Sequence, residues 1–283
     1  AYNLPADNWR WTLGLGAIPA AVFAVGMILS PQSPRWLIRD NQVEKARRVL
    51  KRVRITDDEI ESEITDIQDS LKSQEAGLRE LFGTFRPVMI LLFVLTFFQV
   101  FTGINAAVYY APEIFHNLGM ANASILADFA VGGALVVSTF LSLPFIDRLG
   151  RKKLLEISLG GQVPPAIALC IWSDNATIAI VAIFVYVFAF GFGLGPVFWS
   201  YVPEILPLKA RALGMGVITF TQYLFNGILS LIFPMLLEAL GINVFYIFAA
   251  LSALAVFYIH KNVLETKGRT LEDIELYWET KQV

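Results

Sequence analysis

The sequence predicts an all-α integral membrane protein, and three observations carry that prediction. Apolar residues make up 56% of the 283 residues, and charged residues make up 16%, against about 25% in soluble domains. The apolar residues gather in seven runs, each long enough for the ~20 residues that a bilayer helix needs. Twenty-one of the 22 Lys and Arg residues fall in segments that lie on one face of a membrane if these runs span it.

The expected spans, in chain order, are 11–30, 87–116, 123–146, 154–173, 177–204, 212–237 and 241–260. Their connections alternate between segments that carry only Arg10 and segments that carry all other Lys and Arg residues. By the positive-inside rule the segment 32–86 and the C-terminus face the cytoplasm, across a plasma or bacterial inner membrane. Because the chain starts without Met just before a span, we expect it to be a fragment whose preceding helices are missing.

Several functional classes are not expected. The single cysteine, Cys170, excludes an intramolecular disulfide and a thiolate metal site. No Gly-Lys phosphate loop indicates ATP use, and His116 and His260 stand alone. No basic stripe with interleaved aromatic residues indicates nucleic acid. We therefore expect no enzyme, no catalytic residue, no metal and no cofactor.

One polar insert, residues 32–86, interrupts the apolar pattern. Apolar residues recur at helical spacing in two stripes, Val43, Ala46, Leu50 and Val53 in the first and Ile60, Ile64, Ile67 and Leu71 in the second. Thr56 and Glu59 form a capping box that opens the second helix. The insert is either a solvated linker or a latch on the membrane domain, since periodicity does not reveal what the stripes contact.

The six spans after the insert divide into two sets of three. The first helix of each set is interrupted at a comparable place, by Gly103-Ile104-Asn105 and by Gly191-Phe-Gly-Leu-Gly-Pro196. Proline and glycine weaken the helical hydrogen-bond ladder, so free carbonyls are expected at membrane depth. Such breaks at matching positions of two repeats point to a transporter's substrate site. Close helix packing through glycine is the alternative explanation.

The polar residues within these spans are mostly uncharged: Gln99, Asn105, Tyr109, Tyr110, Trp199, Tyr201, Gln222 and Asn226. Amides donate and accept hydrogen bonds to hydroxyls, and an indole face packs on the apolar face of a sugar ring. The acids lie toward span ends, so an ionic substrate is not expected. Each amide alone also fits an interhelical hydrogen bond.

Five segments resemble the sugar porters of the major facilitator superfamily: Pro31-Gln-Ser-Pro-Arg-Trp-Leu37, Gln99-Val-Phe-Thr-Gly-Ile-Asn105 with Tyr109-Tyr110-Ala-Pro112, Asp147-Arg-Leu-Gly-Arg-Lys152, Gly195-Pro-Val-Phe-Trp199 with Pro203-Glu204, and Glu265-Thr-Lys-Gly268. The resemblance covers nearly the whole chain. It implies an outer loop and the sixth transmembrane helix, the last of the N-terminal half (1–31), followed by an intracellular helical insert (32–86). A C-terminal six-helix half made of two inverted three-helix repeats (87–262) and a cytoplasmic tail (263–283) come after it. The missing N-terminal half would be its partner.

The resemblance also implies roles for the polar residues. Gln99, Asn105, Trp199 and Gln222 would bind the sugar, and Tyr109 and Tyr110 would form the outer gate. Val100 and Leu135 stand where the family often has a glutamine and an asparagine, so hexose, pentose and polyol substrates all remain open.

Charged motif residues would tie the cytoplasmic helix ends together in the outward-open state: Arg35, Asp147, Arg148, Arg151, Glu204, Arg211 and Glu265. Gln32 replaces the family's usual glutamate and Leu264 its usual proline. Exposed ion pairs are individually weak, so a useful latch requires a network. Lys152, Lys153 and Lys209 also fit simple anchors of helix ends.

The expected function is secondary transport of a sugar by alternating access in the lipid bilayer, with protons as the coupling ion. The proton carrier is expected in the missing first helix. A transporter-like sugar sensor without net transport is the alternative. A seven-span receptor is a third possibility, which the short outer loops and the absence of a cysteine pair disfavour.

Overall fold

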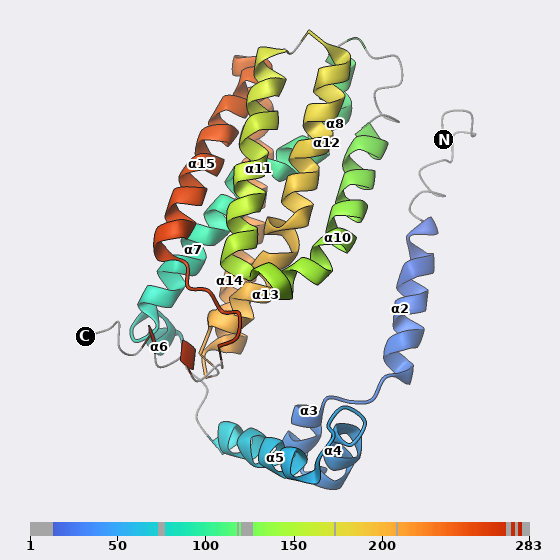
Figure 1. Ribbon diagram of the computed structural model, residues 1–283, viewed down its shortest axis with the longest axis vertical. Helices are drawn as coiled ribbons and strands as arrows, with labels where there is room; N and C mark the ends of the chain where they lie inside the picture. The colour runs from blue at the N-terminus through green and yellow to red at the C-terminus, as the bar shows by residue number, and fades with distance from the viewer. Residues whose placement is uncertain are drawn as a thin grey trace. The chain divides into compact units, whose positions relative to one another are not determined.

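A computed structural model describes residues 14–72, 77–117, 119, 127–172, 174–207, 209–269, 273–274 and 277–278, and every regular element among them is a helix (Figure 1). The chain packs as two compact units, residues 1–74 and 75–283. The division predicted from the sequence, into segments 1–31, 32–86, 87–262 and 263–283, stays a prediction.

The first unit contains α2 (Ala17–Leu29), α3 (Pro34–Arg39), α4 (Val43–Leu50) and α5 (Asp57–Lys72). The second unit contains α6 (Leu78–Phe82), α7 (Arg86–Phe101), α8 (Ile104–Asn117), the π-helical segment η1 (Asp128–Gly133), α10 (Ala134–Leu149), α11 (Arg151–Ile171), α12 (Ala176–Phe192), α13 (Leu194–Ile205), α14 (Arg211–Leu240), the 3-10 turn η2 (Gly241–Asn243) and α15 (Val244–Asn262).

Five helical stretches within the described residues are long and apolar enough to cross a membrane: Arg86–His116, Ala130–Leu149, Arg151–Ile171, Ala176–Ile205 and Arg211–Asn262. The last of these holds α14 and α15, which the turn η2 separates, so it contains two of the predicted spans. Helix α2 is apolar but shorter, with 13 residues. Its predicted run begins at residue 11, and residues 11–13 lie outside the described part, as do residues 123–126 of the third predicted run.

The apolar stripes of the insert pack on one another. Leu37, Ile38, Ala46, Leu50, Ile60 and Ile64 form one buried cluster that joins α3, α4 and α5. Val53 is exposed, because α4 ends at Leu50 and the chain turns before the predicted stripe is complete. The side chain of Leu71 lies outside the described part. The first unit therefore supplies contacts for both stripes from within itself.

Local polar contacts fix the two longer insert helices. The predicted capping box is confirmed: Glu59 N donates to Thr56 Oγ1 at 3.3 Å, and Thr56 N donates to Glu59 Oε2 at 3.4 Å. Cations of α4 and the turn after it meet acids of α5 in the pairs Arg47–Glu61, Lys51–Asp57 (3.2 Å) and Arg54–Glu63 (2.6 Å). The hydrogen bond that Arg54 donates to the Glu63 carboxylate raises the pKa of Arg54. Such exposed pairs add little stability, so the buried cluster dominates.

In the second unit α11 packs on α12 and α15, α10 packs on α12, and α14 packs on α7 (Figure 1). The buried residues form two clusters. One cluster joins α7, α11 and α13 to the chain after α15 and includes Leu92, Phe198 and Val263. The other joins α8, α12, α14 and α15 and includes Ala107, Tyr186 and Phe233. These clusters hold the two interrupted spans in place.

Candidate functional site

The first predicted helix break is present. Helix α7 ends at Phe101 and α8 begins at Ile104. Gly103 lies between them with φ +88°, a conformation that side chains other than glycine rarely adopt. A Cβ at Gly103 would collide with the ring of Phe248 in α15. The hydroxyl of Tyr186 in α12 donates to the carbonyl of Thr102, so a buried side chain satisfies the backbone at this break.

The second predicted break is also present, at Gly193 between α12 and α13. Ser158 of α11 bridges it: its hydroxyl donates to the Ala189 carbonyl at 2.7 Å and accepts from Leu194 N at 2.8 Å. A Cβ at Gly193 would lie 2.5 Å from the Leu154 carbonyl oxygen. Close helix packing through glycine is therefore present at both breaks, and hydroxyl groups of other helices contact the backbone that the breaks release.

Four amide side chains lie on α7, α8 and α14. Asn105 donates from Nδ2 to Oδ1 of Asn226, which joins α8 to α14. Gln99 and Gln222 are 5% and 9% exposed, and the Oε1 atom of each accepts no hydrogen bond from the described residues. Leaving a buried acceptor unpaired costs about 1–3 kcal/mol. Each glutamine therefore keeps an acceptor oxygen that no described residue uses.

Aromatic rings line the same pair of helices. Phe101 of α7 stacks on Phe97 with centroids 4.6 Å apart, and it meets Phe225 of α14 edge-on at 5.6 Å. Phe225 stands next to Asn226 in the sequence, within one helical turn of Gln222. Amides and aromatic faces thus come together where α7 packs on α14, a combination that suits a ligand with both hydroxyl groups and apolar C–H faces.

The other predicted ligand and gate residues are more open. Trp199 on α13 is 38% exposed and contacts Phe198 edge-on at 5.2 Å. Tyr109 on α8 is 59% exposed. Tyr110 is half-buried against Phe233 of α14, with ring centroids 4.8 Å apart. Helix α13 packs on α7 and α14, so Trp199 belongs to a helix that contacts two of the three amide-bearing helices.

Most of the predicted charged residues meet at one end of the second unit. Arg151 contacts Glu204 with Nη2 at 2.9 Å and Asp147 with Nη1 at 3.0 Å. Glu265 accepts hydrogen bonds from Arg151 N at 2.9 Å and Lys152 N at 3.1 Å, so it caps the first turn of α11. These contacts connect α10, α11 and α13 with the chain after α15.

Gly150 and Thr266 complete this ion-pair cluster. Gly150 has φ +89°, and a Cβ there would collide with the Glu265 carboxylate. Thr266 donates from its hydroxyl to Glu204 Oε2 at 2.6 Å. The motif that ends in Gly268 therefore contacts both the helix cap and the Arg151–Glu204 pair.

The remaining residues of the predicted ion-pair network have other contacts than the pairs around Arg151. The side chain of Arg148 is exposed and forms no ion pair within the described part of the chain, although its carbonyl accepts from Lys267 Nζ at 2.7 Å. Arg211 donates to the Leu206 carbonyl at 3.4 Å. Arg35 belongs to the first unit, where it lines a surface pocket with Ser33, Trp36 and Arg39. Lys152 donates to the His260 carbonyl at 2.7 Å.

Sequence reasoning missed the hydroxyl groups that hold the interrupted spans. Ser158 and Tyr186 have no role in the predictions from the sequence, in which Tyr201 is named only among the uncharged polar residues of the spans. Its hydroxyl instead donates to the Leu264 carbonyl at 3.1 Å. The available signal was a hydroxyl group within an otherwise apolar helix, which needs a partner when it is buried.

The profile of the family described as "Sugar (and other) transporter" matches residues 1–278. The chain belongs to this family. It is 36% identical over 282 residues to the D-xylose transporter of Levilactobacillus brevis, covering 95% of this chain and 61% of that protein. It is 34% identical over 279 residues to the galactose-proton symporter of Escherichia coli K12, covering 94% and 60%.

The fold agrees with a solved relative. The E. coli proton:xylose symporter XylE bound to 6-bromo-6-deoxy-D-glucose superimposes with a TM-score of 0.82 at 31% identity, covering 96% of this chain and 60% of that one. The chain thus spans about three fifths of the length of these relatives. The chain is a multi-pass membrane protein, and its fold is that of the C-terminal part of a major facilitator transporter.

Proposed function

We propose that this chain forms the C-terminal part of a secondary sugar transporter that works by alternating access and couples sugar to protons. The observation that carries the proposal is the pair of buried, unpartnered amide oxygens of Gln99 and Gln222 on the packed helices α7 and α14. A sugar hydroxyl donates to such an acceptor, and neighbouring phenylalanine rings pack on the apolar C–H face of a sugar ring.

Each predicted ligand then has a distinct part in recognition. Gln99 and Gln222 accept hydrogen bonds from hydroxyls. Asn105 has its amide oriented by the hydrogen bond to Asn226. Its amide oxygen and its second amide hydrogen bind sugar hydroxyls. Trp199, which is partly exposed on α13, packs its indole face on the sugar. Tyr109 and Tyr110 act as the outer gate on α8.

The relatives support proton coupling, because two of those compared above are named as proton symporters. No Asp or Glu side chain that the structure describes is buried, and the side chain of Asp128 in η1 lies outside the described part. A proton that crosses with the sugar needs an acid within the membrane. We therefore assign the proton-carrying acid to the portion of the relatives' length that this chain does not cover.

The ion-pair cluster is assigned to control of conformation. Arg151, Asp147, Glu204 and Glu265 hold helix ends together in the outward-open state, and Arg148 and Arg211 add charges of the same unit. Arg35, on α3 of the first unit, keeps its predicted role in the network. Separation of these helix ends would open the inward-facing state. The positive-inside rule orients the chain so that the insert and the C-terminus lie on the cytoplasmic side of a plasma or bacterial inner membrane.

Uptake by the full-length transporter that contains this chain tests the proposal. Cells without their own sugar uptake receive labelled xylose, glucose or inositol, with and without a protonophore. We expect saturable uptake of at least one sugar, and we expect it to fall when the proton gradient collapses. Uptake that the protonophore leaves unchanged would contradict coupling. No uptake of any of the three, with the protein at the surface, would favour a sensor.

A further inference from the structure

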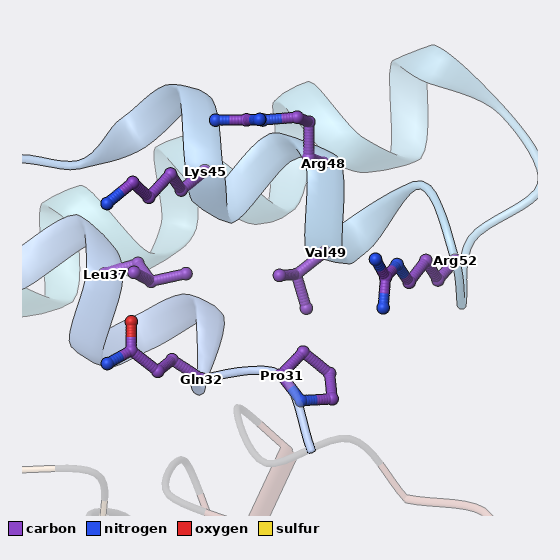
Figure 2. Close-up of a pocket in the computed structure, with 7 residues that line it drawn as sticks. All are labelled: Pro31, Gln32, Leu37, Lys45, Arg48, Val49 and Arg52. Carbon is purple, nitrogen blue, oxygen red and sulfur yellow. The ribbon is translucent and has the colours of Figure 1, made fainter. Parts of the chain in front are cut away.

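A small pocket opens in the first unit, between α3 and α4 (Figure 2). Its volume is about 270 Å³, and its lining consists of Pro31, Gln32, Leu37, Lys45, Arg48, Val49 and Arg52. Figure 2 shows Val49 pointing from α4 toward the Pro31 ring, with the Arg52 guanidinium group beside them. The pocket lining thus combines the apolar side chains of Pro31, Leu37 and Val49 with three cationic side chains, and it includes no carboxylate.

The charges of α4 and the turn after it are divided between two sets. Arg47, Lys51 and Arg54 are paired with acids of α5. Lys45, Arg48 and Arg52 form no ion pair within the part of the chain that the structure describes. The closest polar contacts of this second set are neutral: Lys45 donates to the Gln42 amide oxygen at 2.6 Å, and Arg48 donates to the Glu44 carbonyl at 3.4 Å.

The pocket lies directly after an apolar helix. Helix α2 ends at Leu29, and the lining residues Pro31 and Gln32 follow within three positions. Trp36 on α3 is partly exposed, and tryptophan is enriched at the level of lipid headgroups. A membrane that α2 enters would therefore place its headgroup layer at this pocket, on the side where the Lys and Arg distribution predicts the cytoplasm.

We infer that this pocket binds the phosphate group of an anionic phospholipid. The three unpaired cations of Lys45, Arg48 and Arg52 would contact the phosphate, and Pro31, Leu37 and Val49 would contact the glycerol and the start of the acyl chains. Basic clusters just beyond a membrane helix attract anionic lipids. The inference rests on membrane insertion of the chain and is independent of the sugar that is transported.

Native mass spectrometry of the purified full-length transporter tests this inference. The probe is phosphatidylglycerol, with phosphatidylcholine as the uncharged comparison. Replacing Lys45, Arg48 and Arg52 together by Gln is expected to weaken phosphatidylglycerol binding by about a hundredfold, since each basic residue near a membrane surface contributes about fivefold. The matched control replaces Arg47, Lys51 and Arg54, which are cations of the same segment that already pair with acids of α5, and is expected to retain binding.

A second variant covers loss of folding in the triple substitution. Gln32→Glu keeps the size of the side chain and adds a carboxylate to the pocket, so it should also weaken phosphatidylglycerol binding. Equal losses in the pocket triple and the control triple would overturn the inference, as would unchanged binding in both pocket variants. Saturation by glycerol 3-phosphate as tight as that by phosphatidylglycerol would assign the pocket to a soluble phosphate and would also contradict a lipid site.

Discussion

Tyr186 donates a hydrogen bond from its hydroxyl to the backbone carbonyl of Thr102, and both residues are buried. Thr102 lies at the break between α7 and α8, and Tyr186 lies on α12, the first segment of the other interrupted span. The two interrupted spans are therefore linked directly. A backbone group released by a helix break at membrane depth needs such a partner, because lipid offers none.

Tyr186→Phe removes this hydrogen bond and leaves the ring in place. Interhelical hydrogen bonds in membrane proteins contribute about 0.6 kcal/mol on average and up to about 1.7. We expect the variant of the full-length protein to unfold at a lower temperature. The loss of unfolding free energy should be near the upper value, about 1.7 kcal/mol, because the Thr102 carbonyl stays buried without its partner. Tyr223→Phe, at an exposed tyrosine of α14, is the control. Equal unfolding temperatures for both variants would contradict this account.

Gly193→Ala tests the close contact at the second break. The added Cβ would lie 2.5 Å from the Leu154 carbonyl oxygen and 2.6 Å from Ser158 Cβ. Because the first neighbour is backbone, relief requires movement of α11 against α12. Overpacking of this kind costs about 1–3 kcal/mol. We expect a lower unfolding temperature and reduced uptake.

Gly216→Ala is the matched control for that substitution, because a Cβ at Gly216 of α14 meets nothing within 4 Å. Alanine also favours a helix over glycine by roughly 1 kcal/mol. This variant should unfold at the same or a higher temperature. If Gly193→Ala were as stable as Gly216→Ala, the contact with α11 would not limit packing.

The two ion pairs of Arg151 should differ in strength. Glu204 accepts hydrogen bonds from both Nε and Nη2 of Arg151 and is partly buried, with its side chain 26% exposed, whereas Asp147 accepts from Nη1 alone and is 84% exposed. Hydrogen bonds to charged groups contribute about 1.5–3 kcal/mol when screened from water, and exposed pairs about 0.2–1. Double-mutant cycles on unfolding free energy should therefore give the larger coupling for Arg151–Glu204. A larger coupling for Arg151–Asp147 would contradict this ranking.

Features that depend on neighbouring residues in the sequence could be predicted. The breaks at Gly103 and Gly193 follow from glycine itself, and the capping box of Thr56 and Glu59 follows from a three-residue spacing. The stripe that ends at Val53 went one turn too far, because periodicity does not show where a helix stops. That the stripes of the insert pack on each other could not be read from periodicity either.

Features that depend on which helices become neighbours could not be predicted. Ser158 bonds a carbonyl 31 positions away, and Tyr186 bonds one 84 positions away. Asn226 stood out as a polar residue, but its partner Asn105 is 121 positions away. Resemblance to a family located the charged motif residues, while the separate placement of Arg148 and Arg151 depends on the direction in which each side chain leaves α10 or α11.

If Gln99 and Gln222 bind the sugar, the apparent affinity for sugar uptake depends on them more than on other buried glutamines. The KM for uptake in three single variants measures this dependence. Gln162 of α11 is a matched control, since it is fully buried and its Oε1 atom also has no partner among the described residues. We predict that Gln99→Leu and Gln222→Leu each raise KM by about tenfold, the effect of about 1.4 kcal/mol, while Gln162→Leu leaves KM unchanged at equal surface expression. Equal changes in KM for all three variants would contradict the claim.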